Sequence, residues 1–384
     1  MALYSDIYSN FNHRFILCLL LSASILFCCP LVGIALKGIS IDRFLEFPPL
    51  TRYVSHAPTN AFLFLAGLVL SAFLLCPVVL RFIRALKASR VLGPARSFPK
   101  WGLGGLLLMF VAWASSWGLL PFPCWIRMWS FTPLWLGFIV FVNALSTWRL
   151  GTCLLIRKPG AFLSLFLISC IFWWYFEFLN RFVQNWYYVG VYELGAVRYT
   201  VMASLAFSTV LPAVMSVNDF LKCTRAFEDA FNFKIREKSD VPKPLAVGIL
   251  TVSALALGLI GIYPDLLFPF LWISPLFVIC SIKVLLGLPN LMEIAARKEF
   301  GPLARLSVSG LICGFLWEMW NYLSYPKWVY SIPFVGQCKV FEMPILGYLG
   351  YLPFGLECAA VSSFILPLWE ICKQIPGTQG KFRD

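Results

Sequence analysis

The sequence predicts an all-α polytopic membrane protein with about ten transmembrane helices. Apolar residues make up 60% of the 384 residues and charged residues only 13%. In soluble domains roughly half of the residues are apolar and about a quarter are charged. Apolar runs long enough to cross a bilayer follow one another along the chain. Lys and Arg are concentrated in alternate loops, as in membrane proteins of fixed orientation.

Ten apolar runs are predicted to be membrane-spanning helices. The first is long enough to span and lacks a clear small-residue cleavage site, so we do not expect a cleavable signal peptide. The runs are Phe15–Leu36, Ala61–Leu80, Trp101–Leu120, Phe131–Trp148, Ala161–Leu179, Tyr199–Val217, Leu245–Tyr263, Leu266–Leu288, Leu303–Trp320 and Ile345–Trp369.

The distribution of basic residues predicts the orientation. One set of alternate loops and ends carries 21 of the 31 Lys and Arg residues, and the opposite set carries eight. Cytoplasmic loops are enriched in Lys and Arg, so both termini are expected in the cytoplasm, and a bacterial inner membrane is the expected location. The same distribution accounts for the net charge of +13 without nucleic acid as a partner.

The sequence also indicates an internal repeat. A shift of 141 residues aligns Glu177 with Glu318 and Asn180 with Asn321, and a shift of one more aligns Trp186 with Trp328. Each copy holds four predicted helices, so the copies are expected in the same orientation, related by an axis along the membrane normal. The expected domains are 1–100 (a helix pair and basic loop), 101–217 (first repeat), 218–244 (charged linker) and 245–384 (second repeat and tail).

Several polar residues lie in or beside apolar segments, where they are costly and are functional candidates by default. In each copy a Glu and an Asn three residues apart share one helical face: Glu177 with Asn180, and Glu318 with Asn321. Glu357 lies near mid-membrane in the last helix, four residues after Pro353. The alternative is that these groups only join helices by hydrogen bonds.

These residues predict one cavity between the repeats that holds an apolar, isoprenoid or lipid-like ligand. Buried carboxyl groups of Glu177, Glu318 and Glu357 are the candidate catalytic acids, able to protonate a polyene, and aromatic rings would stabilise the carbocation. The candidate ligand-binding residues are Asn180, Asn321, Trp186, Tyr188, Trp328, Tyr330 and Glu342. Glu342 is expected to open the last helix, where a carboxylate is favoured regardless of function.

One part of this pattern resembles the small membrane lycopene cyclases of the two-subunit type. The matching residues are Trp328 and Tyr330, Gly336, and Glu342 with Pro344, together with Trp186 and Tyr188 in the first copy. The resemblance implies paired helical units that use membrane carboxylates to cyclise a polyene. The cyclases have a Pro-x-Glu-Glu motif, whereas the order here is Phe-Glu-Met-Pro at 341–344.

Other function classes remain open. A transporter or lipid-binding protein would use the same carboxylates at the repeat interface, and a non-catalytic subunit would use the aromatic outer loops to dock a membrane-protein partner. The sequence has no Walker loop, nucleophile elbow or zinc-protease motif, and no cofactor or metal is expected. Cys124 and Cys338 are in outward-facing loops and are expected to be free thiols or one disulfide.

Overall fold

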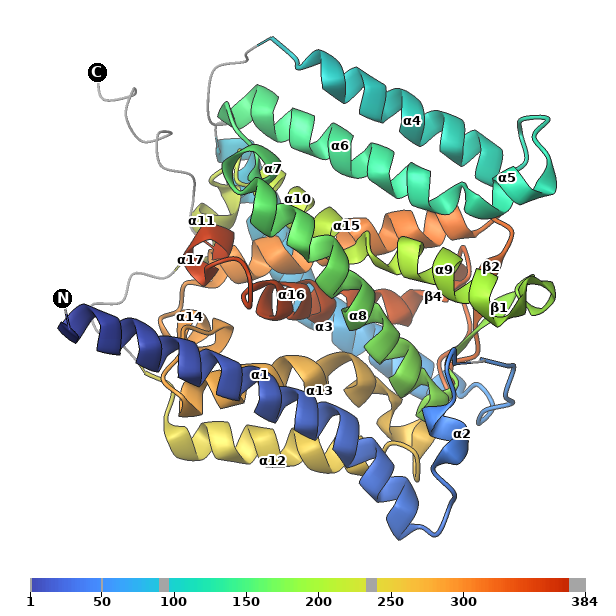
Figure 1. Ribbon diagram of the computed structural model, residues 1–384, viewed down its shortest axis with the longest axis horizontal. Coiled ribbons are helices and arrows are strands. Elements are labelled where there is room, and N and C mark those ends of the chain that lie inside the picture. Colours follow the sequence, from blue (N-terminus) through green and yellow to red (C-terminus); the bar gives the residue numbers. More distant parts are fainter. Residues whose placement is uncertain (1, 50, 90–96, 233–239, 373–384) are drawn as a thin grey trace.

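A computed structural model describes residues 2–49, 51–89, 97–232 and 240–372 of the chain. Long helices lie alongside one another, and short helices and strands gather at the two ends of the bundle (Figure 1). Parts of the predicted basic loops, 90–96 and 233–239, and the predicted basic tail, 373–384, lie outside the described residues.

The long helices match the predicted apolar runs. Eight segments of the described chain are long and apolar enough to cross a membrane, which confirms a helical, multi-span membrane protein. Six of these segments are in uninterrupted helices: α1 (Ala2–Leu36), α3 (Ala61–Ala88), α6 (Phe131–Leu150), α8 (Pro159–Val183), α13 (Pro264–Leu285) and α15 (Phe300–Asn321). Two further predicted runs form the shorter helices α4 (Lys100–Ser116) and α12 (Lys243–Leu259). Helices α4 and α12 have 17 residues each, about 26 Å at 1.5 Å per residue, slightly less than a hydrocarbon core of about 30 Å.

Two predicted helices are broken near a proline. The run from Tyr199 forms α9 (Gly195–Phe207) and α10 (Val210–Leu221), and the last run forms η2 (Ile345–Gly350), α16 (Tyr351–Ser362) and α17 (Leu368–Cys372). Pro212 and Pro353 lie in the first turns of α10 and α16. A proline ring clashes with the carbonyl four residues earlier, so a new helix begins close to the proline.

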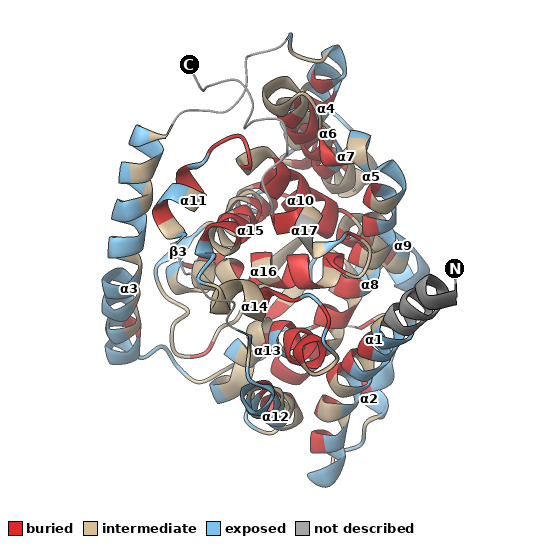
Figure 2. Cartoon of the chain, turned by 90° about the vertical axis from the view of Figure 1, so that its left-hand side faces the viewer, coloured by how far each residue is buried: buried red, intermediate tan, exposed pale blue. Residues whose placement is uncertain are grey.

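The helices at the periphery expose apolar side chains. Figure 2 shows α3 at one side of the bundle with an exposed outer face, whereas α10 and α16 are mostly buried and α8, α13 and α15 are about half buried. In the most apolar 18-residue stretch of α3, only 6% of the residues are buried within the protein. An apolar surface of this length is typical of contact with lipid rather than water.

The two predicted repeats have the same order of elements. Helix α4 packs on α6 and α12 packs on α13, each pair is followed by one long helix (α8 or α15), and each unit ends with a broken span.

The α15–α16 contact depends on two glycines. A Cβ at Gly310 would lie 2.4 Å from the carbonyl oxygen of Tyr351, and one at Gly355 would lie 2.1 Å from that of Leu306. Any larger residue would push the two helices apart.

Two short sheets connect loops at one end of the bundle. Strands β1 (Trp186–Val189) and β2 (Lys327–Tyr330) pair antiparallel, with Trp186 opposite Tyr330 and Tyr188 opposite Trp328. Strands β3 (Lys339–Val340) and β4 (Met343–Pro344) form a second antiparallel pair. The paired segments β1 and β2 are the ones that the predicted repeat aligns.

The two ends of the bundle differ in their short elements. The strand end carries β1, β2, α2 (Asp42–Leu45), α5 (Cys124–Trp129) and η1 (Tyr192–Leu194) (Figure 1). The opposite end, called the α17 end below, carries α17, α7 (Leu154–Arg157), α11 (Ala226–Phe231) and α14 (Leu291–Ala296).

Candidate functional site: an aromatic cavity backed by two carboxyl groups

Glu177 lies near the strand end of α8 and is completely buried. Its Oε1 accepts hydrogen bonds from the hydroxyl of Tyr188 at 2.6 Å and from the indole nitrogens of Trp173 and Trp186, both at 3.1 Å. Trp173 is four residues earlier in the same helix, so it lies on the same face as Glu177. All three donors are neutral aromatic side chains.

Glu318 occupies the corresponding place in α15 and is also completely buried. Its Oε1 accepts hydrogen bonds from Tyr330 at 2.8 Å and from Tyr351 at 2.6 Å. The indole nitrogen of Trp328 donates to the hydroxyl of Tyr330 at 3.0 Å. Each carboxyl group therefore binds a tyrosine two residues after a tryptophan, and both tyrosines belong to the β1–β2 pair.

Asn180 and Asn321 hold the backbones of these two strands. The Nδ2 of Asn180 donates to the carbonyl of Trp186 at 2.8 Å, and its Oδ1 accepts from the amide of Asn185 at 2.8 Å. The Nδ2 of Asn321 donates to the carbonyl of Trp328 at 2.8 Å, and its Oδ1 accepts from the amide of Trp328 at 2.9 Å. In each predicted repeat, one helical face thus fixes a strand by its backbone and by its tyrosine.

The strand pair covers a cavity of about 1080 Å³, including its open mouth. The four aromatic residues predicted as its roof, Trp186, Tyr188, Trp328 and Tyr330, all line it. Trp173 of α8 and Trp317 of α15 meet in its wall, with ring centroids 6.3 Å apart. The other lining residues are Ser116, Arg127, Met128, Phe131, Thr132, Val191, Tyr199, Met202, Ala203, Ala206, Phe207, Val210, Trp272, Ser324, Tyr325, Pro326, Lys327 and Tyr351.

The carboxyl groups lie behind this wall rather than in it. Glu177, Glu318, Asn180 and Asn321 are not among the lining residues, which differs from the prediction. Burial raises the pKa of both Tyr188 and Tyr330 well above the usual value, and the adjacent carboxyl group adds to the effect. The two phenols therefore stay protonated and connect the cavity to the carboxyl groups by one hydrogen bond each.

Glu357 lies apart from this arrangement. It is completely buried in α16 but is not among the residues that line the cavity. Among the described residues, neither of its oxygens has a hydrogen-bond partner, and the hydroxyl of Tyr175 nearby has none either. The structure does not bring Glu357 together with Glu177 and Glu318, because it lies more than one helical turn beyond Tyr351, the α16 residue that reaches the cavity.

Glu342 does not begin a helix, which corrects the prediction. It lies between β3 and β4, three residues before η2, and forms an ion pair with Lys327. The loop folds back as a strand pair here, so the carboxylate meets a lysine of β2 instead of a helix end. The thiols of Cys124 and Cys338 are both free and exposed.

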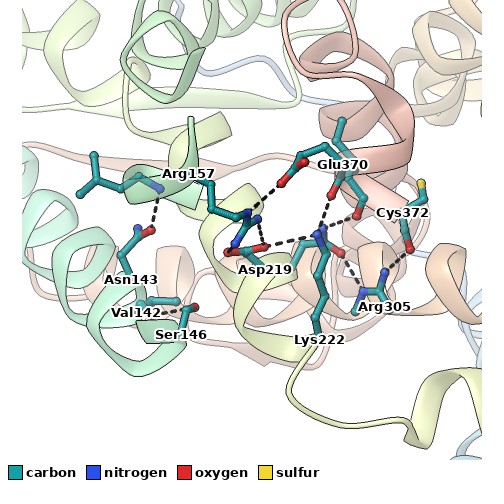
Figure 3. Close-up of polar contacts among 12 residues, drawn as sticks. Val142, Asn143, Ser146, Arg157, Asp219, Lys222, Arg305, Glu370 and Cys372 are labelled. Atoms are coloured by element: carbon teal, nitrogen blue, oxygen red, sulfur yellow. Dashed lines mark hydrogen bonds and ion pairs between the residues drawn. The ribbon is translucent and has the colours of Figure 1, made fainter. Parts of the chain in front are cut away.

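A second polar cluster closes the α17 end of the bundle (Figure 3). The Arg157 guanidinium pairs with Asp219 of α10 and with Glu370 of α17, at 2.8 Å in each case. Lys222 donates to Asp219 at 3.3 Å and to the carbonyl of Glu370 at 2.6 Å. Since Arg157 lies in the first predicted repeat and Glu370 in the second, their ion pair joins the two.

Arg305 of α15 completes the cluster (Figure 3). It is completely buried, pairs with Glu228, and donates to the carbonyl of Cys372 at 2.6 Å. The side chain of Asn218 donates to the carbonyl of Ile371 at 3.0 Å. Cationic and amide groups thus donate hydrogen bonds to the last carbonyl oxygens of α17, at the negative end of the helix.

Sequence reasoning missed several residues of the cavity. Trp173 had a usable signal, because it is four residues before Glu177 on the same helix. Trp272, Trp317 and Tyr351 had none, because aromatic residues are frequent in apolar helices and only the packing selects the ones that face the cavity. Arg127, in the short helix α5, was counted only as a basic residue.

Among the described residues, no group of three or more His, Cys, Asp or Glu side chains is placed to hold a metal ion. The lining of the cavity offers aromatic faces, tyrosine and serine hydroxyls and two basic side chains, and the buried carboxyl groups lie directly behind it. Comparisons of the chain with protein-family models, curated proteins and solved structures found no match.

Proposed function

We propose that this membrane protein binds an apolar lipid or isoprenoid in the cavity beneath the β1–β2 pair. The observation that carries the proposal is the composition of the wall: aromatic rings surround the space, and two buried carboxyl groups lie one hydrogen bond behind it. Aromatic walls favour apolar chains, and a few placed polar groups fix the orientation of a ligand.

Acid chemistry on a polyene is the reaction that this wall suits best. A protonated Glu177 can donate to the oxygen of Tyr188, which turns the phenol hydrogen toward the cavity. When that hydrogen moves to an alkene carbon, the carboxyl proton moves to the phenol oxygen, and a carboxylate and a carbocation result. The rings of Trp173 and Trp317 would stabilise the cation. Glu318 and Tyr330 form the equivalent pair.

The hydrogen bonds support the proposal of two repeats. Under the predicted alignment Trp186 matches Trp328 and Tyr188 matches Tyr330, so the antiparallel register pairs each tryptophan with the tyrosine of the other copy. A two-fold axis between the strands produces this exchange, as expected for copies in the same orientation. The resemblance to lycopene cyclases agrees with such paired units.

The proposal also includes the topology and the location of the protein. We propose that the chain crosses a bacterial inner membrane ten times and that both termini lie in the cytoplasm.

Lipid analysis tests the proposal. The protein is purified in a mild detergent, the bound lipids are extracted, and wild type is compared with Glu318→Gln and Tyr330→Phe. A catalyst should carry a different ratio of substrate to product in the variants, while the total ligand stays similar because the wall is intact. Ala72→Trp is the control and should carry the same lipids as wild type; the absence of any enriched species in both would refute the binding site. Ala72 lies exposed on α3, away from the cavity.

Transport is the second candidate, and the cluster at the α17 end favours it. The cavity includes loop residues of the strand end, whereas at the opposite end an ion pair between Arg157 and Glu370 joins the predicted repeats. Alternating access needs a site that is open on one side and closed on the other by breakable contacts. A transporter should move the co-purifying ligand across proteoliposomes without changing it. A non-catalytic subunit should do neither and should co-purify with a membrane-protein partner.

A further inference from the structure

The charge in the cavity wall is one-sided. Arg127 and Lys327 are the two charged residues among those that line it, and the lining contains no acidic residue. Lys327 is already neutralised by Glu342, which is not part of the lining. Arg127 is therefore the charge that the wall leaves uncompensated.

Arg127 has the geometry of a ligand-binding residue. Among the described residues no carboxylate forms an ion pair with it, and its Nε is buried without a hydrogen-bond partner. Its guanidinium lies against Gly118, where an added Cβ would be 2.7 Å from the guanidinium carbon. Gly118 has a positive φ of 69°, which glycine adopts without strain. The loop thus leaves the room that the guanidinium occupies.

Hydroxyl groups accompany Arg127 at the same part of the cavity. Ser116 and Ser324 both line it, and their hydroxyls are 2.6 Å apart. Ser324 also donates to the carbonyl of Trp320 at 2.6 Å, so both hydroxyl hydrogens are already used within the protein. Arg127 therefore supplies the donors that can bind a phosphate or carboxylate here. Buried guanidinium donors without an acceptor are costly, so an anionic ligand would remove a penalty as well as add contacts.

The polar and apolar parts of the wall are separated along the bundle. Arg127 comes from α5, Ser324 from the loop after α15 and Lys327 from the start of β2, all at the strand end, and Tyr325 beside them is 40% exposed. Trp317, which is 5% exposed, comes from within a predicted membrane span, as do Phe207 and Trp272. A ligand that fills both parts must have a polar head at the mouth and an apolar chain inside.

We propose that the ligand of this cavity is an amphiphile with an acidic head group, phosphate or carboxylate, held by Arg127 with its apolar chain among the tryptophans. This inference rests on the proposed function, because it assigns the head group of the same ligand. It adds a binding residue that the apolar-ligand proposal alone does not require.

Matched isoprenoids test the head group. Farnesol, farnesoic acid and farnesyl monophosphate share one chain, and their binding to the purified protein can be followed by tryptophan fluorescence in a non-ionic detergent. Wild type should bind both anions about tenfold or more tightly than farnesol, the size expected for a charge-assisted hydrogen bond. The two anions together show whether phosphate or carboxylate fits better. Raising the salt concentration should not remove the preference of a partly buried guanidinium.

The variants separate the head group from the cavity. Arg127→Gln should lose the preference for the anions and keep the affinity for farnesol, which also shows that the variant is folded. Arg198→Gln, an exposed arginine of α9 outside the wall, should behave as wild type. Farnesol binding with no preference for the anions in wild type, or a preference that survives in Arg127→Gln, would overturn the head-group inference alone. Failure of wild type to bind any of the three would overturn the proposed function with it.

Discussion

Replacing Asn180 or Asn321 with alanine should loosen the roof of the cavity, and the two positions should differ in cost. Asn180→Ala removes the partners of the Trp186 carbonyl and of the Asn185 amide. Trp186 and Asn185 are each 3% exposed, so water cannot replace the lost partners. A buried polar group without a partner costs about 1–3 kcal/mol, so we expect about 2–5 kcal/mol for Asn180→Ala.

The equivalent change in the second repeat should cost less. Asn321→Ala removes two hydrogen bonds, both to the backbone of Trp328, whereas the Oδ1 of Asn180 also accepts a third, longer bond from the Trp186 amide at 3.4 Å. Trp328 is only half-buried, so water can reach part of the strand, and we expect about 1–3 kcal/mol. The order of the two costs follows from the deeper burial of the Asn180 partners and from the third hydrogen bond that Asn180 accepts.

Unfolding in mixed micelles with increasing sodium dodecyl sulfate measures these free energies, with tryptophan fluorescence as the signal. Asn60→Ala is the control, because Asn60 caps α3 with a single exposed hydrogen bond to Leu63, a contact of about 1 kcal/mol. Hydrogen exchange of the β1 and β2 amides should also accelerate in both roof variants. The reasoning would be refuted if Asn180→Ala cost no more than Asn60→Ala.

Three further predictions concern other parts of the molecule. Tyr188 and Tyr330 have raised pKa values in the folded state. Their contribution to the stability of the fold is therefore present below pH ~10 and is lost as the pH rises above this value. In Tyr188→Phe and Tyr330→Phe, the free energy of unfolding should fall less steeply at alkaline pH. Arg305→Met breaks a buried ion pair and should cost about 3–5 kcal/mol in the same unfolding assay, and a cost below ~1 kcal/mol would contradict the assigned contacts. Gly355→Val should separate α15 from α16 and lower the yield of monodisperse protein in size-exclusion chromatography, and an unchanged yield would contradict the close approach.

The membrane class and the helix ranges follow from the sequence because lipid imposes a strong rule on it. Every spanning segment must be apolar and of bilayer length, which is why the sequence predicts a helical multi-span protein and the described chain has eight segments that could cross a membrane. The Glu and Asn pairs were also visible, because charged and amide groups are rare in such segments. These features depend on composition over short stretches of chain.

The arrangement of the site depends on distant contacts and was less predictable. Strands β1 and β2 are separated by more than a hundred residues, and four-residue strands carry too little pattern to reveal their pairing or register. Glu342 was expected at a helix start because the β3–β4 turn was not recognised. Arg305 is bound inside the protein by Glu228 and by the end of α17, two partners that are distant in the sequence.

The most direct test of the central claim is to fill the cavity and measure what the protein still carries. Ala206 lines the cavity and Ala72 lies on the exposed face of α3, so Ala206→Trp and Ala72→Trp add the same side chain inside and outside the site. Mass spectrometry of the lipids bound to each purified protein should find one apolar amphiphile enriched in wild type and Ala72→Trp and depleted in Ala206→Trp. The same bound lipids in all three proteins would contradict the claim that this cavity is a ligand site.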